Sequence, residues 1–237
     1  LTSGNKLQNL QIPLINYSAV AYGGGTYVMV GTQGVILSST DSINWKAQVS
    51  ETNTGLNNVA YGNGKFVVVG NDGLILTSAT GSTWTVANSG VHNSFIGVSY
   101  LNGKFFALGT DGAILTSSDA STWSQQSSGV TPTLYSISYG SGQYVIVGDA
   151  GVVLTSSDGI IWVSQDIGTA SNLRNITYAQ NMFVLVGASG IIKTSADGIT
   201  WLSQNSGVAV NILSITYAAS QFVAAGVSGT VLTSPTG

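Results

Sequence analysis

The chain has 237 residues, of which 43% are hydrophobic, only 6% are charged and 31 are glycine, with a formal net charge of −3. This composition excludes a disordered chain and a coiled coil. The nine acidic and six basic residues are scattered singly, so no run of Lys or Arg is available to neutralise a phosphate backbone. We therefore expect no nucleic-acid partner.

Membrane insertion is not expected either, because no apolar stretch approaches the about 20 residues that a spanning helix needs. The chain begins at Leu1 without the charged segment of a secretion signal, and we expect a soluble, mature segment. The absence of cysteine excludes disulfides, thiolate chemistry and cysteine-ligated metals. A surface rich in Ser, Thr, Asn and Gly with few charges favours an extracellular or cell-surface location.

A repeat of 39 residues runs through the chain without insertion or deletion. It is carried by five tryptophans, namely Trp45, Trp84, Trp123, Trp162 and Trp201. Six tyrosines keep the same step, namely Tyr22, Tyr61, Tyr100, Tyr139, Tyr178 and Tyr217, as do six glycines, namely Gly31, Gly70, Gly109, Gly148, Gly187 and Gly226. An internal repeat of this length indicates a repeat architecture such as a propeller.

One repeat contains the pattern of four short strands. Apolar runs alternate with Gly-rich turns, which is typical of hairpins. The expected strands are 134–139, 143–147, 152–156 and one that begins near Trp162, with turns at 140–142 and 148–151. Four antiparallel strands in about 40 residues, repeated along the chain, predict the blades of a β-propeller.

Counting the strands predicts how the propeller closes. Six sets of the first three strands are present, but only five Trp-led fourth strands follow them before the chain ends at Gly237. One repeat before Trp45 lies Lys6, so residues 6–10 are expected to form the outer strand of the last blade. We therefore predict a single all-β domain over 1–237, a six-bladed propeller with four-stranded blades, closed by its N-terminal strand.

The residues that precede the tryptophans carry a family resemblance. The segments 156–162, with sequence SSDGIIW, and 195–201, with sequence SADGITW, resemble the Asp-box, or bacterial neuraminidase repeat, of sialidase-type propellers. Thr80 and Thr236 stand where the other repeats carry the aspartate. The resemblance implies a fold element on the blade periphery, where Asp accepts backbone N–H groups and Trp covers the turn. The family includes lectins, assembly factors and surface proteins.

Catalysis is not expected. Sialidases of this family bind the substrate carboxylate with three arginines, whereas this chain has only Arg174, and its one glutamate is Glu51. A glycosidase needs two carboxylates across the scissile bond, and no such pair can be named. The lone histidine, His92, excludes a His-rich metal site. We expect no cofactor and no metal; a glycoside hydrolase is the less favoured alternative.

Candidate binding residues are those that differ between repeats. Asp72, Asp111 and Asp149 lie in the second turns of three consecutive blades, as solvated turn residues or as a site for a cation or a basic partner. Tyr135 and Arg174 lie in adjacent blades at a position where the other repeats hold Ser18, Asn57, Ile96 and Leu213. We expect these five residues to form any ligand site.

Two functions remain open at this point. The first is a non-catalytic binding module for a glycan or a protein partner, which uses the face that carries the second turns and the long connections between blades. The second is a structural or surface-display disc. Lys193 stands where the other repeats have leucine, and we expect its stem along apolar surface with the ammonium in water.

Overall fold

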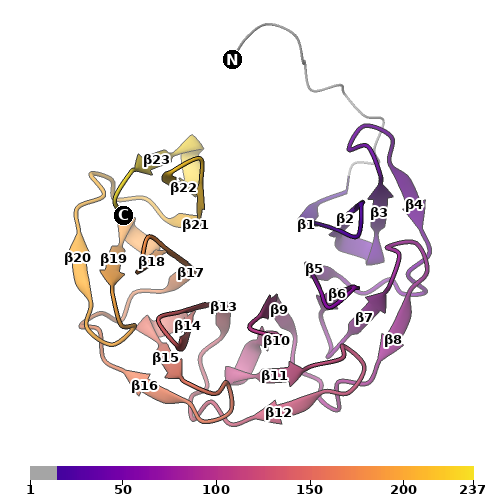
Figure 1. Cartoon of the computed structure of the whole chain (residues 1–237), viewed down its shortest axis with the longest axis horizontal. Coiled ribbons are helices and arrows are strands. Elements are labelled where there is room, and N and C mark those ends of the chain that lie inside the picture. The colour runs from indigo at the N-terminus through magenta and orange to yellow at the C-terminus, as the bar shows by residue number, and fades with distance from the viewer. Residues whose placement is uncertain (1–14) are drawn as a thin grey trace, which may run out of the picture.

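The computed structural model describes residues 15–237. These residues form six antiparallel sheets, five with four strands and one with three. We number the sheets as blades in chain order. Figure 1 shows the blades side by side along an arc, with the first strand of each blade toward the centre and the fourth strand at the rim. The expected outer strand of the last blade, residues 6–10, lies outside the described residues.

The strands repeat in length as well as in sequence. The inner strands are β1 (Tyr17–Gly23), β5 (Leu56–Gly62), β9 (Phe95–Leu101), β13 (Leu134–Gly140), β17 (Leu173–Ala179) and β21 (Ile212–Ala218). The second strands are β2 (Thr26–Gly31), β6 (Lys65–Gly70), β10 (Lys104–Gly109), β14 (Gln143–Gly148), β18 (Met182–Gly187) and β22 (Gln221–Gly226). The third strands are β3 (Ile36–Ser39), β7 (Ile75–Ser78), β11 (Ile114–Ser117), β15 (Val153–Ser156), β19 (Ile192–Ser195) and β23 (Val231–Ser234). The outer strands are β4 (Lys46–Gln48), β8 (Thr85–Ala87), β12 (Ser124–Gln126), β16 (Val163–Gln165) and β20 (Leu202–Gln204).

Short 3₁₀ turns join the second and third strands in five of the six blades. They are η1 (Thr32–Gly34), η2 (Thr110–Gly112), η3 (Asp149–Gly151), η4 (Ala188–Gly190) and η5 (Val227–Gly229). The strand bounds expected for the fourth blade from sequence agree with the observed ones to within one residue. No helix within residues 15–237 has the length and hydropathy that crossing a membrane requires.

Each inner strand has a β-bulge at its second residue. In the fourth blade, Leu134 pairs with Gly148 and Ser136 pairs with Val147, so Tyr135 is the extra residue. The same shift recurs in the other blades. A bulge re-aims the side chain of its extra residue, and bulges are common next to binding sites.

The glycine that ends the second strand is required by a close backbone approach. A Cβ at Gly148 would lie 2.5 Å from the backbone oxygen of Thr133. This distance is shorter than van der Waals contact, so no larger residue fits without a shift of the strand. The contact explains why glycine recurs at this position in every repeat.

The hydrophobic core lies between the blades rather than inside one of them. Between the second and third blades, Val67 and Ile75 pack with Phe95 and Phe105, and all four side chains are fully buried. Trp123 packs at the edge of the same layer, with its ring centroid 6.5 Å from that of Phe105. Because each layer needs two blades, a blade at the end of the series lacks a partner on one side.

The two end blades show this directly. Val20 in the first blade is 57% exposed, whereas its counterparts in the other five blades are 4–7% exposed. Val231 in the last blade is 65% exposed, whereas Ile36, Ile75, Ile114 and Val153 are at 0%. Figure 1 shows an open sector between these two blades. Within residues 15–237 each end blade therefore presents an apolar face to solvent.

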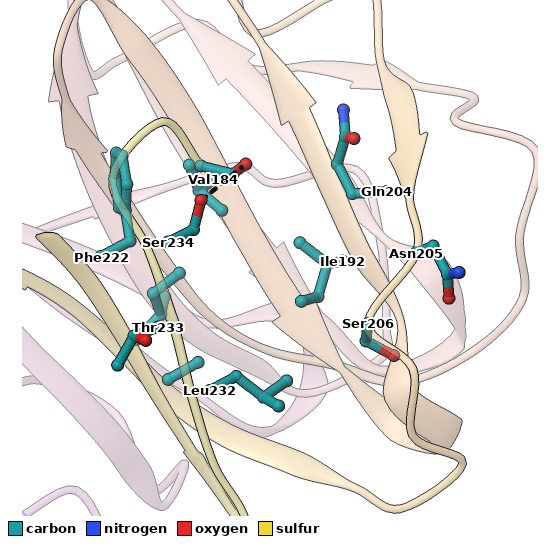
Figure 2. A pocket seen from close by; sticks show the side chains of 12 residues that line it. Val184, Ile192, Gln204, Asn205, Ser206, Phe222, Leu232, Thr233 and Ser234 are labelled. Atoms are coloured by element: carbon teal, nitrogen blue, oxygen red, sulfur yellow. Dashed lines mark hydrogen bonds between the residues drawn. The ribbon is translucent and has the colours of Figure 1, made fainter.

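A groove lies between the fifth and last blades where an outer strand of the last blade would run. Its volume is about 310 Å³, and it is lined by apolar residues that include Val184, Ile192, Phe222 and Leu232, together with several polar side chains (Figure 2). At the matching place in the third blade, β12 and the neighbouring Trp123 cover the core layer. Within residues 15–237 the last blade has no fourth strand, and the groove lies beside its third strand.

The turns before the tryptophans have the hydrogen bonds expected of them. The Asp119 carboxylate accepts the backbone N–H groups of Ser121 and Thr122, both at 2.8 Å. Those bonds, that of Thr122 first, lower the pKa of Asp119 to about 2. The indole N–H of Trp123 donates to the Ala120 carbonyl at 3.3 Å. The aspartate and the tryptophan therefore serve the turn itself.

Candidate functional site

The candidate site is built from the inner-strand bulges and the adjacent turns between second and third strands. The six bulge residues, which we call the bulge ring, are Ser18, Asn57, Ile96, Tyr135, Arg174 and Leu213. They belong to the innermost strands and so border the centre of the arc (Figure 1). All six repeats hold a different residue at this position.

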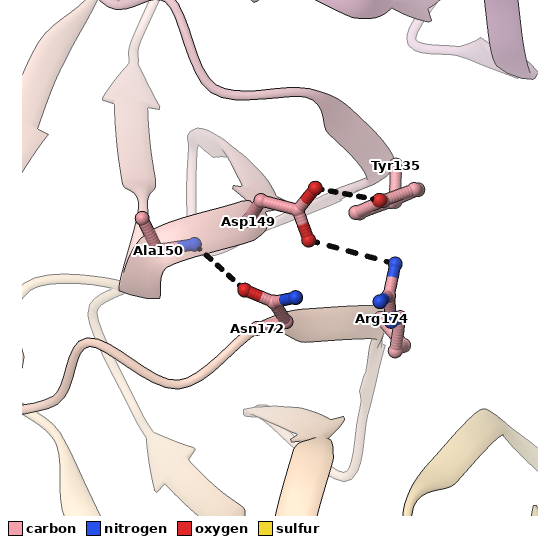
Figure 3. A network of polar contacts seen from close by, with 5 residues as sticks. All are labelled: Tyr135, Asp149, Ala150, Asn172 and Arg174. Atoms are coloured by element: carbon pink, nitrogen blue, oxygen red, sulfur yellow. Dashed lines mark hydrogen bonds and ion pairs between the residues drawn. The ribbon is translucent and has the colours of Figure 1, made fainter.

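In the fourth blade the bulge side chain bonds to its own turn. The Tyr135 hydroxyl donates to Oδ2 of Asp149, the first residue of η3, at 2.7 Å (Figure 3). The second blade repeats the arrangement with other residues, because the Asn57 amide donates to Oδ1 of Asn71 at 2.9 Å. The bulge thus places one variable side chain next to one variable turn residue in each of these blades.

Arg174 joins this pair from the fifth blade (Figure 3). Its guanidinium carbon lies 4.5 Å from the centroid of the Tyr135 ring, within the range of a cation–π contact. Nη1 lies 3.6 Å from Asp149 Oδ1, and the Arg174 and Asp149 side chains are 31% and 29% exposed. We call Tyr135, Asp149 and Arg174 the Tyr135 cluster. Such a part-exposed ion pair stabilises by at most about 1 kcal/mol.

The surroundings of Tyr135 keep its hydroxyl protonated. Burial, and then the hydrogen bond to Asp149, raise the pKa of Tyr135. The hydroxyl of Tyr135 is therefore a neutral donor at physiological pH, and its acceptor is Oδ2 of Asp149. The other oxygen, Oδ1, is buried and has the Arg174 contact but no hydrogen bond within the described residues.

The other two aspartates do not join the cluster. Asp72 and Asp111 lie in the equivalent turns but one position later, in left-handed backbone with φ of 56° and 55°. Ala150 holds this position in the fourth blade. Asp72 and Asp111 are exposed, and Asp111 accepts a hydrogen bond from the Asn93 amide at 3.2 Å. Among residues 15–237, no three acidic or histidine side chains lie close enough together to hold a metal ion.

Some contacts were not foreseen from sequence. Asn172, in the loop before the fifth blade, accepts the backbone N–H of Ala150 at 3.0 Å and so fixes the turn that carries Asp149 (Figure 3). Lys193 is 7% exposed and donates to the Ser203 hydroxyl at 2.9 Å. Its expected position with the ammonium in water is wrong, because the neighbouring outer strand covers it.

Comparison with known proteins identifies the fold. No protein-family model matches the chain, and no curated protein sequence matches it. A solved structure of YCF48 bound to D1 peptide aligns with a TM-score of 0.75 at 17% identity over 94% of this chain and 78% of that chain. The computationally designed Ika8 protein aligns with a TM-score of 0.75 at 15% identity over 92% of this chain and 70% of that one. YCF48 from Cyanidioschyzon merolae aligns with a TM-score of 0.55 at 15% identity, covering 92% and 94%. Together with the six repeated sheets, these likenesses show that the chain has a β-propeller fold.

Proposed function

We propose that the chain is a non-catalytic protein-binding module whose Tyr135 cluster contacts an extended segment of a partner protein. The observation that carries the proposal is the cluster itself. Two adjacent blades bring together Tyr135, Asp149 and the only arginine, and the tyrosine and the arginine stand at a position where the other repeats hold different residues. Residues that the blades share serve the fold, so a site with one location uses residues that differ.

The fold neighbours support a protein segment as the ligand, because YCF48 has been solved bound to a D1 peptide. A glycan is the second candidate, but Arg174 covers one face of the Tyr135 ring, where a sugar would stack. A relation to Asp-box proteins, an extracellular location and the absence of catalysis belong to this proposal. They rest on the turn motif, the surface composition and the lack of a carboxylate pair suited to glycoside cleavage.

A peptide-display screen tests the function. Peptides selected on the wild-type protein should bind Tyr135→Ala or Arg174→Gln about tenfold more weakly, as for a central contact residue. The matched control is Lys65→Gln, whose side chain lies on the opposite face and donates to the Asp119 carbonyl. Equal binding by all of these variants would place the ligand elsewhere, and failure to select any binding peptide would favour the structural-disc alternative.

We further propose that residues 6–10 form the outer strand of the last blade and that the blades close into a ring. The exposed apolar faces of the first and last blades and the groove beside β23 support this closure. The third blade gives the register, because Ile114 pairs with Gln126 there. If the last blade has the same register, Asn9 lies opposite Val231.

A disulfide tests this register, since the native chain has no cysteine. Asn9→Cys with Val231→Cys should oxidise to an intramolecular disulfide in dilute solution. Asn9→Cys with Leu232→Cys, one residue out of register, should oxidise much more slowly. Disulfide-linked dimers, or equal rates for the two pairs, would contradict closure by this strand.

A further inference from the structure

Among the residues that the structure describes, the guanidinium of Arg174 has more N–H donors than acceptors in contact with it. An arginine presents five N–H groups in a planar fork. Within residues 15–237, Nη1 lies 3.6 Å from Asp149 Oδ1, which is longer than a hydrogen bond, and the guanidinium carbon lies over the Tyr135 ring. The side chain is 31% exposed. The fork is therefore held in position, and the exposed part of the side chain is available to a ligand.

Apolar side chains lie on both sides of this polar centre. Along the bulge ring, Tyr135 and Arg174 are preceded by Ile96 from the third blade and followed by Leu213 from the last. Ile96 is half-buried and Leu213 is 48% exposed. A ligand that crosses the ring would thus meet an apolar contact, the arginine and a second apolar contact in succession.

We propose that the Tyr135 cluster recognises a carboxylate that lies next to apolar side chains in the partner segment. This inference rests on the proposed function and names the chemical group that the site selects. A carboxylate accepts two parallel N–H groups from one guanidinium, and such charge-assisted bonds are about twice as strong as neutral ones. The group is either the C-terminal carboxylate of the segment or an acidic side chain within it.

Asp149 has a defined part in this proposal. It anchors Arg174 and the Tyr135 hydroxyl, but its own negative charge also competes with the incoming carboxylate. Removing that charge should therefore strengthen binding, in contrast to the loss expected if Asp149 itself contacted a basic partner. Stronger binding after removal of the Asp149 charge therefore indicates a carboxylate in the partner segment, and weaker binding indicates a basic partner.

The single arginine provides a direct reporter, because only one Nε–Hε signal of arginine exists in the NMR spectrum. We would titrate the protein with N-acetyl-leucine and, as its uncharged match, N-acetyl-leucinamide. The second pair of probes is N-acetyl-Leu-Glu-Leu-amide and the same peptide with Gln in place of Glu. A charged member should shift the Arg174 signal in a saturable way and its match should not, and the responding pair distinguishes a C-terminal from a side-chain carboxylate.

Variants complete the test. Asp149→Asn should lower the dissociation constant of the responding probe by about two- to fivefold, the range expected for one part-exposed charge pair. Asp111→Asn is the matched control, since it removes one negative charge from an exposed turn away from the cluster, and should change binding little. Arg174→Gln should abolish the binding, followed on backbone amide signals of the inner strands.

Several outcomes would overturn the inference: no shift by any probe, equal shifts by the charged and uncharged members of both pairs, or weaker binding by Asp149→Asn. If display-selected peptides bind at Tyr135 but tolerate amidation and Glu→Gln exchange, the protein-binding function stands and carboxylate recognition fails. If the charged probes bind but no selected peptide depends on Tyr135 or Arg174, the protein-binding function fails instead.

Discussion

Trp123→Ala should destabilise the protein through the core layer between the second and third blades. The indole packs at the edge of that layer, 6.5 Å from the Phe105 ring, and its N–H donates to Ala120. Removal of a packed tryptophan costs about 3–5 kcal/mol, and the half-buried position of Trp123 favours the lower end. For a chain of this size, a loss of about 3 kcal/mol lowers Tm by about 6–12 °C.

Guanidinium unfolding followed by circular dichroism measures the loss. Gln125→Ala is the matched control, since Gln125 is exposed on the adjacent outer strand, and its effect should stay within about 0.5 kcal/mol. The folded fraction of Trp123→Ala should keep the peptide specificity of the wild type. A loss below about 1 kcal/mol would refute the packing role assigned to the indole. A stable variant that no longer binds peptide would show that Trp123 belongs to a binding surface.

Three further outcomes are expected. The folded protein holds the pKa of Asp119 at about 2, below the ordinary 3.8, so its carboxylate stabilises the fold above about pH 4. This contribution disappears as the pH falls toward 2. The melting temperature between pH 5 and 2.5 should therefore depend less on pH for Asp119→Asn than for the wild type. Deletion of residues 1–10 should lower the free energy of unfolding by several kcal/mol. In the Val20→Cys variant, the cysteine should react faster with a maleimide in the truncated chain than in the full one. Equal reaction rates would argue against ring closure. Gly148→Ala should cost about 1–3 kcal/mol because its Cβ would lie 2.5 Å from the Thr133 oxygen, and an unchanged denaturation midpoint would contradict that contact.

The sequence by itself determines the blade. Strands, turns and inter-blade layers follow from local patterns that recur every 39 residues, so each repeat confirms the interpretation of the others. The observed strand bounds of the fourth blade lie within one residue of the expected ones because Gly140 and Gly148 end two of its strands. The variable position occupied by Tyr135 and Arg174 was also visible, since only a repeat allows a residue to be compared with its counterparts in the same chain.

The tertiary structure decided which of the candidate residues meet. Asp72, Asp111 and Asp149 all lie in turns of neighbouring repeats, and the sequence shows that Asp149 comes one position earlier in its turn but does not show what this offset does. A difference of one position in the turn, however, leaves the first two exposed in left-handed backbone and brings Asp149 to Tyr135. The contact with Arg174 crosses from one blade to the next, so it depends on how two sheets pack. Spacing along the chain does not specify such a contact, because the bulge and the packing of the sheets set the direction of each side chain.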